Sequence, residues 1–383
     1  MIVWLSNFIN HHQAPVAREL FRLTDGQYRF IEMKQMRQSF LSSGYPEFIH
    51  TPWLIKAWEN IESHKKAERL FLDADVAVYG GYYPYKWIIQ RLDTGKITFE
   101  YGERWMKRGI WNLLSPRLMK HQWHYHVHFS GKSLYRLNAG AYAADDMRFL
   151  HSFRGKQFKW GYFTDVQEKN LAELHSRRGS DVIRIMWCAR FIRLKHPEMA
   201  VVVASRLKDA GIRFSLDMYG TGPEESKIKA RVMHEHLEEY VNFHGNLPNA
   251  ELMRKMDEAD IFLFTSDRRE GWGAVINEAM SRGCAVISSD APGCAKWLIS
   301  DQNTGIVFKS GNTDDLISKI LLLVRDKERI RRIGTDAYRK MLEEFSPQRV
   351  AARFIKLATD IRYNSGKTVF TEGICSPDID SNT

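Results

Sequence analysis

Short apolar runs alternate with amphipathic helical patterns along the second half of the chain. Five apolar runs predict strands, at residues 181–188, 214–220, 241–245, 261–264 and 285–289. The intervening segments have apolar positions at helical spacing and predict helices at residues 197–210, 224–236, 249–258 and 274–281. Strands that alternate with helices of about 10–15 residues are typical of a doubly wound parallel sheet.

The first half of the chain shows the same alternation less clearly. Strands are predicted at residues 2–5, 74–79 and 96–100, and helices at residues 16–23 and 85–92. The segment 118–129 fits a helix and a strand equally well. The sequence therefore predicts an α/β protein with two Rossmann-like domains.

The domain boundaries are predicted from local composition. A polar stretch at residues 175–180 predicts a linker between a domain of residues 1–175 and a domain of residues 181–345. Residues 346–365 form a further helical segment. The tail, residues 366–383, is polar and contains proline and glycine, so we expect it to be disordered.

Composition narrows the class of protein. The 383 residues include 44% hydrophobic and 27% charged residues, which excludes a collagenous, coiled-coil or disordered chain. The start has no basic region before an apolar one, and no apolar stretch reaches the ~18–20 residues that span a bilayer. The four cysteines have no framework spacing, so we expect a cytoplasmic protein.

The positive charge is concentrated in the first half. The formal net charge is +10, and residues 1–175 contain 24 lysines and arginines against 17 aspartates and glutamates. They also contain eight of the eleven tryptophans. This pattern fits an anionic partner or a solvated basic surface. Nucleic acid is the unlikelier partner, because there is no dense basic run and no nucleic-acid-binding motif.

Candidate binding residues follow the predicted strands of the second half. Arg190 and Lys195 follow the first of them and can converge on a diphosphate. Gly220 and Gly222 follow the next, where they either let a ligand approach the backbone or form an ordinary turn. Because parallel strands end at one edge of a sheet, ligands of such folds bind there.

The segment 269–280 follows the strand 261–264 and is the most informative. It holds Glu270 and Glu278, eight residues apart, on either side of a glycine-containing helix start. If the helix included both, the two carboxylates would lean to one side. Carboxylates accept hydrogen bonds from sugar hydroxyls and bare amides donate them, so this pattern favours a polyhydroxylated ligand over a helix with acidic capping residues.

These motifs together resemble a known family. The order Arg190-x4-Lys195, Tyr219-Gly-Thr-Gly-Pro223, His244-Gly245 and Glu270-x7-Glu278 is similar to that of the family-four retaining glycosyltransferases with the GT-B fold. The resemblance covers residues 183–345 in detail and the first half in outline. It implies two Rossmann-like domains facing each other across a cleft, with a last helix, residues 346–365, that crosses back to the first domain.

The resemblance also implies roles for residues. Arg190 and Lys195 would neutralise the diphosphate of a UDP- or GDP-sugar donor, and Glu278 would bind its ribose. The donor sugar would lie against Glu270 and the backbone of Gly271, Trp272, Gly273 and Ala274. The base would lie near Gly220, Gly222 and His244. No cofactor and no metal ion are implied.

The first half departs from the family pattern. The loop after its first strand, residues 6–13, has no glycine but contains His11 and His12, and either histidine could face the reacting carbon. Where relatives often have a histidine after a middle strand, this chain has Glu100 and Glu103, of which we prefer Glu103. We therefore predict Arg190, Lys195, Glu270, Glu103 and His12 as the catalytic set.

Two metal-like patterns are alternatives of lower weight. Asp73-Ala-Asp75 has the spacing of metal-binding carboxylates but begins a predicted strand instead of following one. His124-x-His126-x-His128 would share a face only if the segment were a strand.

The predicted activity is transfer of a sugar to a glycan or lipid-linked acceptor in the synthesis of lipopolysaccharide, capsule or exopolysaccharide. A sugar-nucleotide epimerase and a polysaccharide synthase are the alternatives. We further expect peripheral docking on an anionic membrane surface. If residues 103–111 are helical, Arg104, Lys107, Arg108 and Trp111 share a face.

Overall fold

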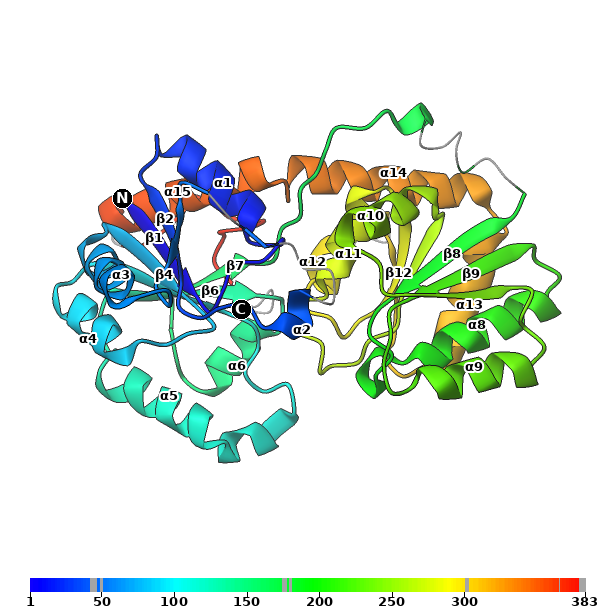
Figure 1. Ribbon diagram of the computed structural model, residues 1–383, viewed down its shortest axis with the longest axis horizontal. Helices are drawn as coiled ribbons and strands as arrows, with labels where there is room; N and C mark the ends of the chain where they lie inside the picture. The colour runs from blue at the N-terminus through cyan, green and yellow to red at the C-terminus, as the bar shows by residue number, and fades with distance from the viewer. Residues whose placement is uncertain are drawn as a thin grey trace. The chain divides into compact units, whose positions relative to one another are not determined.

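The computed structural model describes residues 1–41, 47–48, 51–173, 178, 181–299, 303–364 and 366–378. These residues form two compact units (Figure 1). Unit 1 contains the described residues up to Asp165 and those from Glu344 onward. Unit 2 contains the described residues from Val166 to Glu343.

Unit 1 is built on a parallel sheet with the strand order β3-β2-β1-β4-β5-β6-β7 in its described residues. The strands are β1 (Ile2–Ser6), β2 (Tyr28–Glu32), β3 (Leu54–Lys56), β4 (Val76–Tyr79), β5 (Ile97–Gly102), β6 (Leu134–Ala139) and β7 (Gln157–Trp160). The helices are α1 (Ala14–Leu23), α2 (Gln38–Leu41), α3 (Ile61–Asp73), α4 (Tyr85–Asp93), α5 (Pro116–Val127), α6 (Ala143–Phe149) and α15 (Pro347–Tyr363), with a 3₁₀ helix η1 at Gly109–Leu114.

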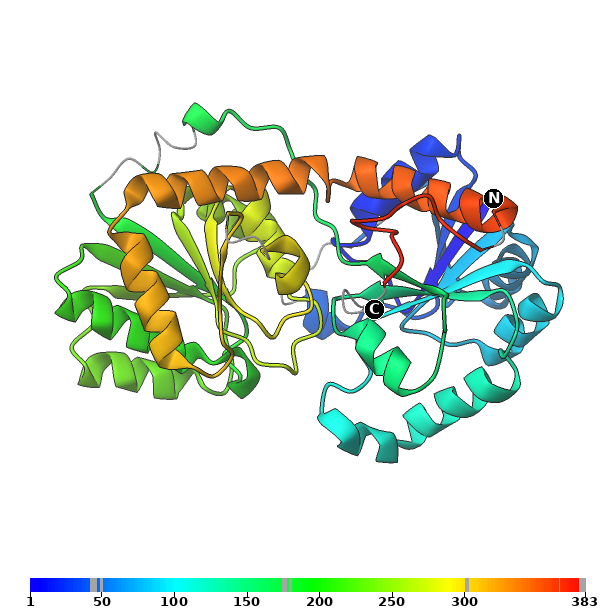
Figure 2. The same cartoon turned by 180° about the vertical axis from the view of Figure 1, so that it is seen from behind.

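Helices cover both faces of this sheet, and successive strand residues point to opposite faces. Val3 and Leu5 of β1 share a core with residues of α3, α4 and α5. Trp4, between them, packs on the other side against Phe354 of α15, with ring centroids 5.8 Å apart. The helix α15 also packs along α1, so the closing helix of the chain belongs to unit 1 (Figures 1 and 2).

The end of the chain differs from the predicted disordered tail. Residues 366–378 lie on unit 1, where Ile374 and Cys375 are buried. The backbone of Lys159 in β7 donates to Ser376 at 3.0 Å and accepts from Cys375 at 2.8 Å. The polar composition concealed this contact, which satisfies hydrogen-bonding groups along β7 that would otherwise be an open edge.

Unit 2 is a second parallel sheet, with the strand order β10-β9-β8-β11-β12-β13 in its described residues. The strands are β8 (Ile183–Cys188), β9 (Phe214–Tyr219), β10 (Val241–Gly245), β11 (Ile261–Phe264), β12 (Ala285–Ser289) and β13 (Ile306–Phe308). The helices are α8 (Pro197–Asp209), α9 (Glu225–His234), α10 (Asn249–Glu258), α11 (Ala274–Ser281), α12 (Ala295–Leu298), α13 (Thr313–Val324) and α14 (Lys327–Glu343), with a 3₁₀ helix η2 at Arg193–Lys195.

Unit 2 begins earlier than the predicted boundary at residue 181. The hydroxyl of Tyr338 in α14 donates to the carbonyl of Gln167 at 3.0 Å and accepts from the amide of Lys169 at 2.8 Å. These hydrogen bonds attach residues near 167 to unit 2. The predicted linker, residues 175–180, lies outside the described residues except for Arg178, which is buried and donates to the carbonyls of Asp257, Met256 and Arg282.

The predicted strands and helices of the second half are all present, and the α/β fold class is confirmed. The ambiguous segment 118–129 is helical as α5. Residues 103–108 are not helical and only residues 109–111 of this stretch fall in η1, so the condition under which Arg104, Lys107, Arg108 and Trp111 would share a helix face is not met. None of the described helices combines the length and apolar composition needed to cross a bilayer.

Candidate functional site

The strand order of each sheet reverses at one point, where ligands of open α/β sheets bind. In unit 1 this point lies between β1 and β4, and in unit 2 between β8 and β11. The loops that follow these strands contain most of the predicted site residues.

Lys195 and Glu270 form an ion pair at this point of unit 2. Lys195 ends η2, in the loop after β8, and Glu270 lies in the loop after β11. Both side chains are mostly buried, at 14% and 17% exposure. The lysine Nζ also lies 5.1 Å from the ring centroid of Phe264, the last residue of β11. Two of the predicted site residues are therefore brought together across 75 residues of sequence.

Two cross-links hold the Lys195 loop against the β11 loop. The hydroxyl of Thr265 donates to the carbonyl of Lys195 at 2.6 Å and accepts from the indole Nε1 of Trp187 at 3.0 Å. The backbone amide of Asp267 donates to the carbonyl of Leu194 at 2.9 Å. Thr265 and Asp267 were not predicted as site residues. Their position directly after a buried strand is the only feature of the sequence that indicates such a role.

His196 adds a third link, in the left-handed backbone region at φ 47°. Its ring nitrogens lie 2.7 Å from a carboxylate oxygen of Glu198 and 3.4 Å from one of Asp267. The hydrogen bond to Glu198 raises the pKa of His196, followed by smaller effects that include Asp267. A protonated imidazole would thus add positive charge beside Lys195.

Glu278 lies one turn into α11 and is buried at 5% exposure. Its Oε1 accepts a hydrogen bond of 3.2 Å from the side-chain amide of Asn249, the first residue of α10. Burial raises the pKa of the Cys188 thiol, at the end of β8, to about 12, with Glu278 raising it further and Lys195 lowering it. Cys188 therefore lies within electrostatic reach of both groups.

The helix α11 begins at Ala274, so Glu270 precedes it and the two glutamates do not share a helix face. The conditional prediction of one shared side fails for this reason. Glu270 is instead held by a turn in which its amide donates to the carbonyl of Asp267 at 2.9 Å.

Arg190 is exposed, two residues after β8. Its backbone carbonyl accepts a hydrogen bond of 2.8 Å from the amide of Ile192. No ion pair to its guanidinium appears among the described residues. Its charge therefore remains available to a ligand at this edge of the sheet.

Gly220 and Gly222 are required by the protein's own backbone. A Cβ on Gly220 would lie 2.0 Å from the carbonyl oxygen of Ala189, and one on Gly222 would lie 2.4 Å from that of Phe191. The open side at each Cα is thus filled by the loop after β8, which the sequence could not show. Of the two alternatives, the structure favours the turn.

The segment Gly271 to Ala274 is paired with the loop before α12. The carbonyl of Gly271 accepts from the amide of Gly293 at 2.8 Å, and that of Trp272 accepts from Cys294 at 3.1 Å. The indole of Trp272 is buried at 1% exposure and donates to Asn277 at 2.7 Å, so only the backbone of Trp272, as predicted, is left to meet a donor sugar. Gly273 caps α11 at φ 89°, and the first amides of the helix follow it.

His244 lies at the end of β10 and is exposed. Its ring stacks on Tyr219 with centroids 4.6 Å apart, and its Nε2 lies 2.7 Å from Asp217 Oδ1. The backbone amide of Gly220 donates to the carbonyl of Gly245 at 2.7 Å. The residues predicted to surround the base are therefore neighbours.

A pocket of about 540 Å³ opens at the switch point of unit 1. Its walls come from the loops after β1, β4 and β5 and from the η1–α5 segment; they include Asn7, Asn10, Gly81, Glu103, Arg104, Lys107, Asn112, Ser115, Arg117, His121 and Tyr162. Glu103, the preferred carboxylate, lines it and pairs with Lys107. Arg117 and His121 were missed because their segment was not assigned a structure.

Glu100 is fully buried and forms an ion pair with Arg136, which is also fully buried. The hydroxyl of Tyr83 donates to Glu100 Oε1 at 3.3 Å. Burial raises the pKa of Glu100, while Arg136 lowers it. A carboxylate enclosed in this way positions β5 and β6, whereas Glu103 can reach a ligand.

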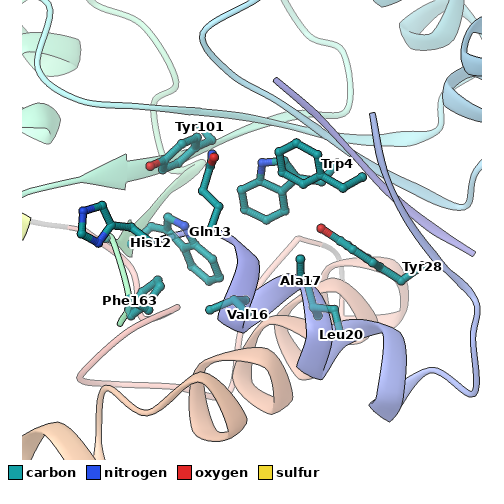
Figure 3. Close-up of a pocket in the computed structure, with 12 residues that line it drawn as sticks. Trp4, His12, Gln13, Val16, Ala17, Leu20, Tyr28, Tyr101 and Phe163 are labelled. Atoms are coloured by element: carbon teal, nitrogen blue, oxygen red, sulfur yellow. The ribbon is translucent and has the colours of Figure 1, made fainter. Parts of the chain in front are cut away.

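His12 lines a different space, a cavity of about 20 Å³ beneath α1 (Figure 3). The cavity lies among Trp4, Val16, Leu20 and Tyr28, and holds about one water. His12 is not among the described residues that line the 540 Å³ pocket of unit 1. The rings of His11 and His12 have centroids 3.8 Å apart.

The two metal-like patterns have other partners. Asp75 binds the amino group of Met1 at 2.6 Å, which lowers its pKa. His124, His126 and His128 lie on and just after a helix, where the rings of His124 and His128 have centroids 5.3 Å apart and His126 lies on another face. His124 stacks on Tyr85, with centroids 3.8 Å apart, whereas His126 contacts Gln122.

Comparison with known proteins shows that the second half is similar to a known family. Residues 175–340 match the family described as Glycosyl transferases group 1, which confirms the resemblance for this part of the chain. The amylovoran biosynthesis glycosyltransferase AmsK of Erwinia amylovora is 30% identical over 176 residues, which are 45% of this chain and 43% of the relative. A putative colanic acid biosynthesis glycosyltransferase, WcaL of Salmonella typhimurium, is 25% identical over 179 residues, covering 45% and 44%. The match thus spans less than half the length of these curated relatives.

Solved structures extend the likeness of fold to nearly the whole chain. A glycosyltransferase from Rickettsia africae has a TM-score of 0.66 at 13% identity, covering 95% of this chain and 98% of its own. Sucrose-phosphate synthase from Thermosynechococcus elongatus also has a TM-score of 0.66, at 14% identity and with 95% and 99% covered. The fold is GT-B, with two Rossmann-like units.

Proposed function

We propose that this protein is a retaining glycosyltransferase that uses a nucleotide-diphosphate sugar. The observation that carries the proposal is the Lys195–Glu270 ion pair at the switch point of a unit that matches Glycosyl transferases group 1. Glu278 and the exposed Arg190 lie on loops and a helix at the same edge of the sheet. A cationic cluster beside hydrogen-bonding carboxylates fits a ligand with both a diphosphate and sugar hydroxyls.

Each group has a role in this proposal. Arg190 and Lys195 neutralise the diphosphate as it leaves, because fixed positive charge stabilises the negative charge that develops in the transition state. Glu278 accepts hydrogen bonds from the ribose hydroxyls. Glu270 and the first amides of α11 hold the donor sugar, and the neighbouring loops of Gly220 and His244 surround the base. A structure of HepE from Anabaena, with a TM-score of 0.65 and 13% identity over 94% of this chain and 99% of its own, was solved with UDP.

The proposed reaction proceeds on one face of the donor sugar. The bond from the anomeric carbon to the diphosphate oxygen breaks as the bond from the acceptor oxygen forms. The acceptor proton passes to the departing phosphate oxygen. Arg190 and Lys195 supply the charge stabilisation, so the proposal includes no metal ion or other cofactor.

In this proposal the acceptor binds in the unit 1 pocket, and Glu103 is the carboxylate nearest the acceptor's reacting group. The pocket also offers the side chains of Asn7, Asn10 and Asn112, which suit a polyhydroxylated ligand. We propose a glycan or lipid-linked acceptor in the synthesis of a surface polysaccharide, as the names of the two relatives describe for them. The chain is proposed to work in the cytoplasm.

Donor binding tests this proposal directly. The full chain is titrated with UDP-glucose, UDP-N-acetylglucosamine, UDP-galactose and GDP-mannose by calorimetry, and donor hydrolysis is followed by release of the nucleotide. At least one donor should bind, and Lys195→Ala should weaken it by about ten- to a hundredfold, the loss expected for hydrogen bonds to charged groups.

Lys229→Ala is the matched control, because Lys229 forms an ion pair with Glu225 on the surface of the same unit. Loss of binding in both variants, or no binding of any donor, would contradict the proposal. Conversion of one sugar nucleotide to another without acceptor would identify an epimerase instead.

A further inference from the structure

The η1–α5 segment of unit 1 exposes an unusual amount of apolar surface. Of the thirteen large apolar side chains that are exposed among the described residues, six lie between residues 110 and 127. They are Ile110, Trp111, Leu114, Met119, Trp123 and Val127. Trp111 is 75% exposed and Trp123 is 56% exposed. Exposed apolar residues scattered singly are ordinary, whereas a cluster of this kind marks an interaction surface.

The pattern on α5 is the reverse of that on an ordinary surface helix. Met119, Trp123 and Val127 are four residues apart and form one stripe, which faces outward. Leu118 and Tyr125, on the other side, are buried. A helix that meets only water would carry polar residues along the outward stripe. Figure 1 shows α5 on the side of the unit 1 sheet opposite α1 and α15, where it forms an outer layer.

The charge around this surface has one sign. Residues 104–144 contain seven lysines and arginines and no aspartate or glutamate. Among the residues beside the apolar stripe, Arg108, Arg117 and Lys120 are exposed. Arg104 and Lys107, which the sequence analysis assigned to this surface, are engaged with Asp146 and Glu103. The available cations are therefore Arg108, directly before η1, and Arg117 and Lys120 of α5.

We propose that the outward face of η1 and α5 docks on a bilayer that contains anionic lipid. Two exposed tryptophans, aliphatic side chains and flanking cations without acidic residues match the boundary between lipid headgroups and acyl chains. The absence of acidic residues favours this occupant over a protein partner, whose surface presents both signs of charge. Each exposed cation strengthens binding only about fivefold near such a surface, so docking is reversible.

The inward side of the same segment gives docking a use, and this step rests on the proposed function. Asn112, Ser115, Arg117 and His121 line the unit 1 pocket. One short segment thus separates the pocket from the docking face. An acceptor whose lipid remains in the bilayer would have to cross only this distance to place its polar group beside Glu103. The inferred acceptor class is therefore a lipid-linked sugar or phosphate.

Vesicle co-sedimentation tests the surface without any donor or acceptor. The full chain is mixed with vesicles of phosphatidylcholine alone, or of equal parts phosphatidylcholine and phosphatidylglycerol. It should sediment with the second and remain mostly in the supernatant with the first, and salt should weaken binding. Trp111→Ser/Trp123→Ser should reduce binding at least tenfold. Arg108→Ser/Lys120→Ser should reduce it about fivefold per charge.

Matched controls come from α3 of the same unit. Ile61 is 76% exposed, and Lys65 and Lys66 are exposed, so Ile61→Ser and Lys65→Ser/Lys66→Ser should bind as the unchanged chain does. Equal loss in these controls would overturn the proposal. Recovery in the supernatant with both kinds of vesicle, or self-association through Trp111 and Trp123, would also overturn it.

The two proposals fail separately. Vesicle binding without binding of any sugar nucleotide would support the docking surface and contradict the proposed glycosyltransferase activity. Donor binding without vesicle binding would do the reverse.

Discussion

The hydroxyl of Thr265 donates a hydrogen bond of 2.6 Å to the backbone carbonyl of Lys195, and accepts one of 3.0 Å from Trp187 Nε1. The Thr265 side chain thus links the end of β8 to the residue directly after β11, and it fixes the position of the Lys195 backbone. Lys195 is therefore held from both its backbone and its ammonium group, which pairs with Glu270.

Thr265→Val should loosen this arrangement without touching the ligand. The variant removes a donor and leaves the buried Trp187 Nε1 without an acceptor, at a cost of about 1–3 kcal/mol. We expect a lower melting temperature and weaker donor binding. Thr265→Ser retains the hydroxyl and should restore both. If Thr265→Val binds donor as the unchanged chain does, Thr265 does not position Lys195.

Gly220→Ala should destabilise unit 2 far more than a change at an unconfined glycine. Gly220 has φ 119°, and its new Cβ would lie 2.0 Å from the carbonyl oxygen of Ala189. Gly211 is also at positive φ, 67°, but has open space around it, so Gly211→Ala should cost only about 1 kcal/mol. Denaturant unfolding of both variants measures the difference. Equal costs would show that the loop after β8 can yield.

Ionisation of Asp378 should make the contact of residues 366–378 with unit 1 depend on pH. Burial raises its pKa from 3.8 to about 6, against the hydrogen bond from Asn138. The folded state binds the proton of the Asp378 carboxyl more tightly than the unfolded state does. The stability that the protonated carboxyl contributes is therefore fully present below about pH 4 and is lost as the pH rises through 6. Asp378→Asn should therefore be more stable than the unchanged chain at pH 7, by up to about 3 kcal/mol, and similar to it at pH 4. Thermal unfolding across this range measures the gap, and a gap that does not change with pH would exclude this origin.

His121 should act with the opposite sign. Burial lowers its pKa from 6.5 to about 4, with Arg117 as the next cause, and its Nδ1 lies 2.6 Å from the hydroxyl of Tyr85. The unfolded chain then binds the proton more tightly, so this contribution is present above about pH 6.5 and is lost as pH falls towards 4. NMR titration should show His121 neutral at pH 6. A His121 signal that titrates near pH 6.5 would contradict the assignment.

The predictable parts of this protein are those fixed by local pattern. The strands before Arg190 and Glu270 are short and almost wholly apolar, and their alternation with helices defines both the sheet and the edge where these residues meet. That Lys195 and Glu270 lie at one edge of the sheet followed from this alternation, whereas the ion pair between them was not predicted. Whether Glu100 or Glu103 reaches a ligand depends on one residue beyond the end of β5, and the preference for Glu103 agrees with the lining of the pocket.

The remainder depends on contacts between distant segments. The clash that requires Gly220 involves Ala189, and the cavity beside His12 depends on α1 packing over Trp4 and Tyr28. The chain end was predicted as disordered because it is polar and contains proline and glycine, but Ile374 and Cys375 within it are buried. They are buried because β7 offers an edge for them to pair with, which no local pattern contains.

Unit 2 is an insertion within unit 1, and this sets an order for synthesis. The ribosome synthesises all of residues 166–343 before it makes α15, whose Phe354 packs against Trp4, Phe99 and Trp160. Unit 2 can complete its sheet while the nascent chain is still attached. Unit 1 must wait, with one side of its sheet covered by α1 but not yet by α15, until α15 emerges. The half of the protein that is made first is therefore the half that finishes folding last.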